Sequence, residues 1–241
     1  KYYYTEIEGS KPIKDPRIGA HFGSQRHKIT SVQLLEQETA THGLSVYSID
    51  GRDGSLNWEF NAGHNTHPTS GPSLAIGDDG KVFIGGTKKL WCLDQSTGRI
   101  IWFNQSYGIA YEGPVLDDVG SIYFRTWNRL ISLKASTGQL NWEMQPQGGG
   151  PGRHQNTPIL GRGNDIHITT WGGKVVTINR NSGAEKSFNE GLGSFYSAPV
   201  LDGDGNLLAA TEGGGAGGSL YKINTESREI LWRLSNSKGI G

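Results

Sequence analysis

One sequence pattern occurs five times along the chain of 241 residues. Residues 90–103 read LWCLDQSTGRIIWF and residues 130–144 read LISLKASTGQLNWEM, so an apolar segment, a turn and a second segment with tryptophan follow one another. The turn position recurs at spacings of 44, 40, 45 and 45 residues and holds Gly54, Gly98, Gly138, Gly183 and Arg228. Four residues later the chain has Trp58, Trp102, Trp142, Ser187 and Trp232.

A second landmark precedes the last four copies, at Pro72, Pro114, Pro158 and Pro199. Each proline is followed by a short apolar segment, a turn rich in Asp, Gly or Asn, and an alternating segment, which predicts two more antiparallel strands. Four short strands in each repeat of 40 to 45 residues are typical of a propeller blade. We therefore predict an all-β protein, a β-propeller of four-stranded antiparallel blades. About five blades occupy residues 44–241 of one domain, and residues 1–43 form an extension with a degenerate half-blade.

The turn glycine and the tryptophan have distinct physical roles in such a repeat. Glycine takes a positive φ at no steric cost, which suits the tip between the third and fourth strands. The tryptophan can pack against the neighbouring blade while its indole N–H finds a carbonyl. Arg228 lacks glycine's conformational freedom, so the sequence predicts a differently shaped turn in the fifth copy.

Composition and charge limit the class of partner. The 37 glycines disfavour a helical bundle, because glycine is costly inside helices. Lys+Arg and Asp+Glu both number 23, so no net basic field attracts a nucleic acid, and no nucleic-acid partner is predicted. No apolar run is long enough for a membrane-spanning helix. The single cysteine, Cys92, lies in an apolar segment and is predicted to be a buried core thiol.

The segments LDQSTGRIIW and LKASTGQLNW resemble the tryptophan-docking motif of the PQQ-like β-propeller repeats. These repeats occur in quinoprotein alcohol dehydrogenases and in an outer-membrane assembly lipoprotein, and the resemblance covers about residues 44–234. It implies a propeller of seven or eight blades, of which this chain holds about five, so the chain forms either a small ring or part of a larger one. A periplasmic or secreted location is what the resemblance favours. The motif joins blades and does no chemistry, so it implies no particular activity.

The strand order of an up-and-down meander divides the loops into two sets, one at each end of the blades. The links between blades and the loops between second and third strands share one end, called here the loop-rich face; they are residues 61–71, 104–113, 125–128, 145–157, 169–173, 189–198 and 211–219. The opposite end, called the acidic-turn face, holds residues 77–80, 117–120, 161–165 and 202–206.

Aromatic and basic residues gather in the loop-rich segments. Rings stack on apolar ligand surfaces, while guanidinium and imidazole groups bond hydroxyls or carboxylates, a combination that suits a sugar or peptide. The candidate ligand-binding residues are Tyr111, Arg125, Trp127, Arg153, His154, Trp171 and Tyr196. In the alternative interpretation, the tryptophans among them only cap the inner strands.

Three functions stay open at this point. The first is a non-catalytic module that binds a carbohydrate or protein ligand, or acts as a protein scaffold, through the loop-rich face. The second is a polysaccharide lyase, with Tyr111 or His154 as general base and Arg125 or Arg153 neutralising a uronate carboxylate. The third is a fragment of a dehydrogenase dependent on pyrroloquinoline quinone and calcium. Such enzymes typically carry adjacent cysteines, and this chain has one cysteine, so no cofactor is predicted.

Two short motifs resemble metal ligands. His64 and His67 are three residues apart, but the sequence identifies no third ligand for zinc. Asp202 and Asp204 resemble part of a calcium loop that lacks its closing glutamate, so a turn is predicted instead. The sequence therefore predicts no metal site.

Overall fold

The computed structural model describes residues 32–35, 43–64, 74–86, 89–105, 113–126, 128–146, 156–195, 197–212 and 218–235, and every regular element within them is a β-strand. The strands form five antiparallel sheets in chain order, called here the first to fifth blades. The first blade holds β1 (Val32–Leu35), β2 (Gly43–Ile49) and β3 (Leu56–His64); the second β4 (Leu74–Ile76), β5 (Lys81–Gly85), β6 (Leu90–Asp94) and β7 (Ile100–Asn104); the third β8 (Val115–Leu116), β9 (Ser121–Arg125), β10 (Leu130–Lys134) and β11 (Leu140–Met144); the fourth β12 (Ile159–Leu160), β13 (Asp165–Thr169), β14 (Val175–Asn179) and β15 (Glu185–Asn189); the fifth β16 (Val200–Leu201), β17 (Leu207–Thr211), β18 (Ser219–Ile223) and β19 (Ile230–Ser235).

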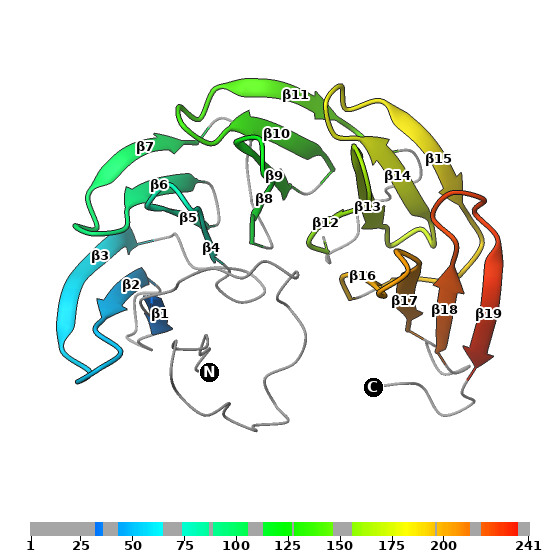
Figure 1. Ribbon diagram of the computed structural model, residues 1–241, viewed down its shortest axis with the longest axis horizontal. Helices are drawn as coiled ribbons and strands as arrows, with labels where there is room; N and C mark the ends of the chain where they lie inside the picture. The colour runs from blue at the N-terminus through cyan, green and yellow to red at the C-terminus, as the bar shows by residue number, and fades with distance from the viewer. Residues whose placement is uncertain are drawn as a thin grey trace.

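The blades follow one another around an arc, with β4, β8, β12 and β16 on its inner side and β7, β11, β15 and β19 on its outer side (Figure 1). The predicted β-propeller of four-stranded antiparallel blades is therefore confirmed. Four of the sheets have four strands, and the first has three among the described residues. Its strand β1 lies within residues 1–43, the segment expected to hold a half-blade. In the described part of the chain, no helix is long and apolar enough to cross a membrane.

The hydrophobic core lies between neighbouring blades. The two middle strands of the second, third and fourth blades are buried on both faces, because each sheet is covered by a sheet on either side. Cys92 belongs to the cluster between the second and third blades and is fully buried, as predicted. Burial raises the pKa of its thiol to about 12, so this group is an unreactive part of the core.

Three of the four repeat tryptophans contact the turn of the following blade. The indole Nε1 of Trp58 donates to the Gln95 carbonyl at 2.8 Å, and Trp102 and Trp142 donate to Ala135 and Arg180 at 3.0 and 2.8 Å. The acceptor stands three residues before the turn glycine in all three cases. A Cβ added to that glycine would lie 2.6 or 2.7 Å from the indole. The tryptophan of one repeat and the glycine of the next are thus two halves of one contact, called here the Trp–turn contact.

The two irregular repeats belong to a single junction. Ser187 replaces tryptophan in the fourth blade, and Arg228 replaces glycine in the turn that the missing indole would contact. The prediction of a differently shaped turn is wrong: Arg228 has a φ of 66°, close to the 71° of Gly138, and its N–H donates to the Asn224 carbonyl at 2.9 Å. Without an indole above the turn, a Cβ has room there. The side-chain amide of Asn189 donates to the Arg228 carbonyl at 2.7 Å, as that of Asn104 donates to the Gly138 carbonyl at 3.4 Å in a regular junction.

We expect Arg228→Gly to raise the free energy of unfolding by about 1 kcal/mol, because a non-glycine residue in the left-handed region costs about 1–2 kcal/mol. Urea unfolding measures the change. Glu226→Gly in the same turn is the matched control, because Glu226 has no positive φ. Glycine there only raises the conformational entropy of the unfolded chain, which lowers the free energy of unfolding. A loss of stability in Arg228→Gly would show that the arginine side chain itself stabilises the junction.

Candidate functional site

The loop-rich face is the first candidate site. Each blade is a simple meander, so the links between blades and the loops between second and third strands lie at one end, as the sequence predicted. Of the seven candidate residues, Arg125 and Trp171 can be placed. The other five, Tyr111, Trp127, Arg153, His154 and Tyr196, lie outside the described residues. Their convergence on one cavity therefore stays a prediction.

Arg125 joins two blades. It is the last residue of β9 and is only 3% exposed, because the fourth blade covers it. Its Nη1 donates to the backbone carbonyl of Thr169, the last residue of β13, at 2.6 Å. A hydrogen bond from a buried guanidinium is strong, so this contact holds the ends of the two strands together. The guanidinium thus links the ends of the two strands from which loops of the loop-rich face start.

A polar network extends this support to the fifth blade. The side-chain amide of Asn156 donates to Thr169 Oγ1 at 2.8 Å and to the Phe195 carbonyl at 3.4 Å. Thr169 Oγ1 in turn donates to the Ser197 carbonyl at 3.3 Å. Asn156 and Thr169 are both buried, and breaking hydrogen bonds between buried groups is costly. The loop-network, meaning Arg125, Asn156, Thr169 and these carbonyls, therefore fixes the bases of loops from three successive blades.

Trp171 stands on a tight turn beside this network. It lies two residues after the end of β13 and is half-buried. The turn is closed by hydrogen bonds from Thr170 N to the Lys174 carbonyl and from Gly173 N to the Thr170 carbonyl, at 2.9 and 3.1 Å. Gly173 has a φ of 78°, and a Cβ there would come within 2.9 Å of the Gly193 backbone. This close approach fixes the turn, so the indole is presented from a rigid base.

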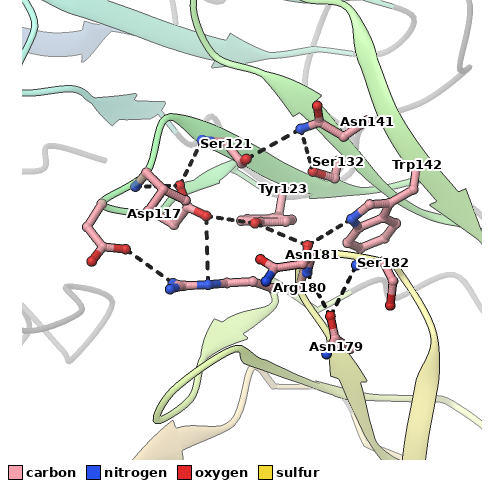
Figure 2. Close-up of polar contacts among 12 residues, drawn as sticks. Asp117, Ser121, Tyr123, Ser132, Asn141, Trp142, Asn179, Arg180, Asn181 and Ser182 are labelled. Atoms are coloured by element: carbon pink, nitrogen blue, oxygen red, sulfur yellow. Dashed lines mark hydrogen bonds and ion pairs between the residues drawn. The ribbon is translucent and has the colours of Figure 1, made fainter.

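The acidic-turn face uses its carboxylates within the fold. Figure 2 shows the junction of the third and fourth blades, where the buried Asp117 accepts hydrogen bonds from the backbone of Ser121 at 2.7 Å and from Tyr123 Oη at 2.7 Å. Burial and the hydrogen bond to Asp117 raise the pKa of the Tyr123 hydroxyl. Arg180 belongs to the fourth blade, and its Nη1 lies 3.3 Å from Asp118 Oδ1 of the third blade. Its backbone carbonyl accepts the hydrogen bond from Trp142 Nε1. The junction is therefore an ion-paired seam.

Carboxylates of three other acidic turns on this face form ion pairs within their own blades. Lys81 contacts Asp79, Lys186 contacts Asp165, and Lys222 Nζ lies 2.7 Å from Asp202 Oδ2. A pocket of about 440 Å³ opens beside the seam of Figure 2, lined by Ser121, Lys134, Leu140, Asn141, Trp142, Arg180 and Asn181. Asn141 donates to Ser121 and Ser132 within the third blade, and Trp142 donates to the Arg180 carbonyl across the junction, so these polar groups of the lining are already hydrogen-bonded within the fold.

The candidate metal ligands that the sequence suggested do not come together among the described residues. Asp202 Oδ1 accepts from the backbone of Asp204 at 2.9 Å and of Asn206 at 2.8 Å, which is the predicted turn. The hydrogen bond from Lys222 holds the pKa of Asp202 below its usual range. His67 lies outside the described residues. Within the ranges that the structure describes, no three His, Cys, Asp or Glu side chains come together as a metal site.

The chain was compared with known families and structures. The sequence profile of the family described as outer membrane protein assembly factor BamB matches residues 43–240. The structure resembles BamB from Moraxella catarrhalis, with 16% identity and a TM-score of 0.62 over 86% of this chain and 71% of that one. It also resembles a quinohemoprotein alcohol dehydrogenase from Comamonas testosteroni, with 12% identity and a TM-score of 0.61 over 86% of this chain and 42% of that one.

A third structural relative has a different kind of repeat. The WD40 domain of Pan2 from Neurospora crassa shows 15% identity and a TM-score of 0.54, over 70% of this chain and 50% of that one. At such identities the three structures share the fold alone with this chain. No curated protein sequence matches the chain.

Proposed function

The chain belongs to the family of the outer membrane protein assembly factor BamB, and from this premise we propose that it is a non-catalytic scaffold for protein segments during outer-membrane protein assembly. Membership confirms the resemblance to PQQ-like propellers that the sequence indicated. The proposal adds a place of action outside the cytoplasm, a protein partner, and the loop-rich face as the binding surface.

The observation that supports this proposal is the loop-network. Loops usually lose conformational entropy on binding a partner, and that loss lowers affinity. Here Arg125 and Asn156 bond to Thr169 from two different segments, and both side chains are buried. The bases of loops from three blades are therefore already ordered before a partner arrives. A surface that is ordered in this way is suited to binding an extended segment across several blades.

Trp171 is the described residue best suited to contact the partner. Its indole is half-buried on a rigid turn, so it combines apolar area with little entropy to lose. By their place in the chain, Tyr111, Trp127, Arg153, His154 and Tyr196 belong to the same set of loops and stay predicted members of the surface. No described contact favours the lyase or the quinone-dependent dehydrogenase, and these stay untested predictions.

A strand-like peptide tests the proposal. Transmembrane β-strands alternate apolar and polar residues over about 10 positions. We expect a fluorescently labelled peptide with this alternation to bind, and Trp171→Ala to weaken binding by about 10-fold or more, as for a central aromatic anchor. Fluorescence anisotropy measures both affinities. A shuffled peptide of the same composition should bind more weakly, and Val119→Ala on the acidic-turn face should leave the affinity unchanged.

The outer strand of the second blade is an alternative binding surface for the same peptide. The outer strand β7 exposes Ile100, Ile101 and Phe103, and Phe103 is 53% exposed with Lys89 Nζ 5.9 Å from its ring centroid. Such an apolar edge strand can pair with a peptide. If Phe103→Ser abolishes binding and Trp171→Ala does not, the loop-rich face is the wrong surface. Equal binding of the alternating and shuffled peptides contradicts the scaffold function itself.

A further inference from the structure

The outer strand of the second blade differs in charge from the other outer strands. The outer strands of the first, third, fourth and fifth blades each contain at least one charged residue, whereas β7, with the sequence IIWFN, contains none. Charged residues on an edge strand hinder its pairing with another chain. Within the described part of the chain β7 pairs with β6 alone, so its other edge has no partner strand there. The outer edge of β7 therefore lacks the protection that charge gives the other four.

The repeats show at which positions this difference lies. Ile101 and Phe103 stand on either side of Trp102 on β7 and are 45% and 53% exposed. By strand register, the corresponding pairs in the first, third, fourth and fifth blades are Asn57 and Glu59, Asn141 and Glu143, Lys186 and Phe188, and Leu231 and Arg233. Each of these pairs includes a polar or charged residue. The fold of a blade therefore does not require two apolar side chains at these positions.

A cation beside the outer strand is neutralised in the next two blades. In the third blade Arg129 directly precedes β10, and its Nη1 lies 2.5 Å from Glu143 Oε1 of β11. In the fourth blade Lys174 directly precedes β14, and its Nζ lies 3.3 Å from Oε2 of Glu190, the residue after β15. An ion pair between this position and the outer strand is thus a recurring feature of the repeat.

The second blade has the cation without the carboxylate. Lys89 directly precedes β6, and Phe103 stands where the third blade has Glu143. The Lys89 Nζ lies 5.9 Å from the centroid of the Phe103 ring, and no carboxylate of the described residues forms an ion pair with it. An unneutralised ammonium group therefore lies next to two exposed apolar side chains.

We propose that Lys89, Ile101 and Phe103, called here the rim patch, bind an extended segment of a partner protein that carries apolar side chains and a glutamate or aspartate. The segment adds a strand to the outer edge of β7 and packs its apolar side chains on Ile101 and Phe103. Its carboxylate pairs with Lys89, as Glu143 pairs with Arg129 in the third blade. The first and third blades flank the second, and β7 lies on the outer side of the arc (Figure 1), so a further blade at either end of the arc would not cover it.

The rim patch is a second surface and does not depend on the proposed scaffold function. The strand-like peptide of that proposal needs no charge, whereas the rim patch selects a carboxylate beside apolar side chains. Binding of the strand-like peptide should therefore be the same in wild type and in variants of the rim patch.

A pair of peptides with blocked termini tests the rim patch. One peptide alternates valine and threonine over about eight residues, within the range of ordinary strands, and has glutamate at both ends. In the other peptide glutamine replaces both glutamates. We expect the glutamate peptide to bind about 3-fold more tightly at low salt, as for an exposed ion pair, and this preference to disappear in about 1 M salt. Fluorescence anisotropy of labelled peptides measures the affinities. Lys89→Gln should remove the preference at every salt concentration.

Phe103→Glu reproduces in the second blade the arrangement of the third. The new carboxylate can pair with Lys89, so the variant loses both the apolar contact and the unneutralised charge. We expect it to weaken binding of the glutamate peptide by about 10-fold or more, as loss of an aromatic anchor does. Leu140→Ser is the matched control, because it removes an exposed apolar side chain from β11, and it should leave the affinity unchanged. Trp171→Ala should leave it unchanged as well.

Hydrogen exchange shows where the glutamate peptide binds. Amides of residues 100–104 should exchange more slowly in the complex, because an added strand bonds those that face outward. Circular dichroism checks that each variant is folded. A wild-type chain that binds neither peptide overturns the proposal, as does equal affinity for the two peptides at low salt. Slower exchange in the loop-rich segments and not in β7, with weaker binding to Trp171→Ala and not to Phe103→Glu, also overturns it and assigns the peptide to the loop-rich face.

Discussion

Replacing the partly buried Trp142 by alanine is expected to lower the free energy of unfolding by about 3 kcal/mol, the lower end of the range for large aromatic residues in a core. The indole packs on Gly183 of the fourth blade and against the ring of Tyr123, with ring centroids 5.9 Å apart. Its Nε1 also donates to the Arg180 carbonyl at 2.8 Å. Alanine leaves a cavity between two blades and a carbonyl without its donor, and both effects destabilise the same junction.

Trp232→Ala is the matched control for this change. The residue type, strand position and lost volume are the same, but Trp232 makes no Trp–turn contact within the described chain and is 43% exposed. We expect a loss below about 1 kcal/mol, as for a surface substitution. Urea unfolding followed by circular dichroism and tryptophan fluorescence measures both variants. Equal losses at the two positions would mean that the contact with the turn contributes nothing.

The propeller could be predicted from the sequence because its signals are local. Turn glycines, strand alternation and the tryptophan four residues beyond three of the four turn glycines all lie within about 15 residues of one another, and the repeat shows each signal several times. The blades can therefore be recognised by aligning the copies with one another. The relation between Ser187 and Arg228 is not visible within one repeat, because the two residues belong to successive blades.

The loop-network could not be predicted for a related reason. Arg125 and Thr169 are 44 residues apart, and their hydrogen bond runs from a side chain to a backbone carbonyl, which any residue type could supply. Two weak signals were present: Asn156 stands two residues before Pro158, and Thr169 ends an alternating strand with a polar residue. Neither distinguishes a buried partner from an exposed one. The sequence indicates Arg125 as a ligand-binding residue, and in the structure its guanidinium donates to the Thr169 carbonyl.

Lowering the pH from 7 to 4 is expected to remove about 3 kcal/mol of stability through one residue, His167. Its imidazole is buried between the fourth and fifth blades' strands, lies against Gly161, and has Nδ1 3.0 Å from Thr177 Oγ1. Burial lowers its pKa from 6.5 to about 4, while nearby Asp165 opposes the shift and Lys186 adds to it. Between these two pH values the unfolded chain binds a proton that the folded chain does not. The contribution is therefore complete above about pH 6.5 and is lost as the pH falls toward 4.

His167→Gln separates this effect from the carboxylates that titrate in the same range. Glutamine cannot be charged by acid, yet its amide can still bond the Thr177 hydroxyl. Free energies of unfolding measured by urea at several pH values should give a difference, wild type minus variant, that falls by about 3 kcal/mol between pH 7 and pH 4. The variant itself starts from a lower stability at pH 7, because its longer side chain fits the space against Gly161 less well. If the two curves run parallel, His167 is protonated in the folded chain as easily as in the unfolded one, and its burial between the blades does not govern acid stability.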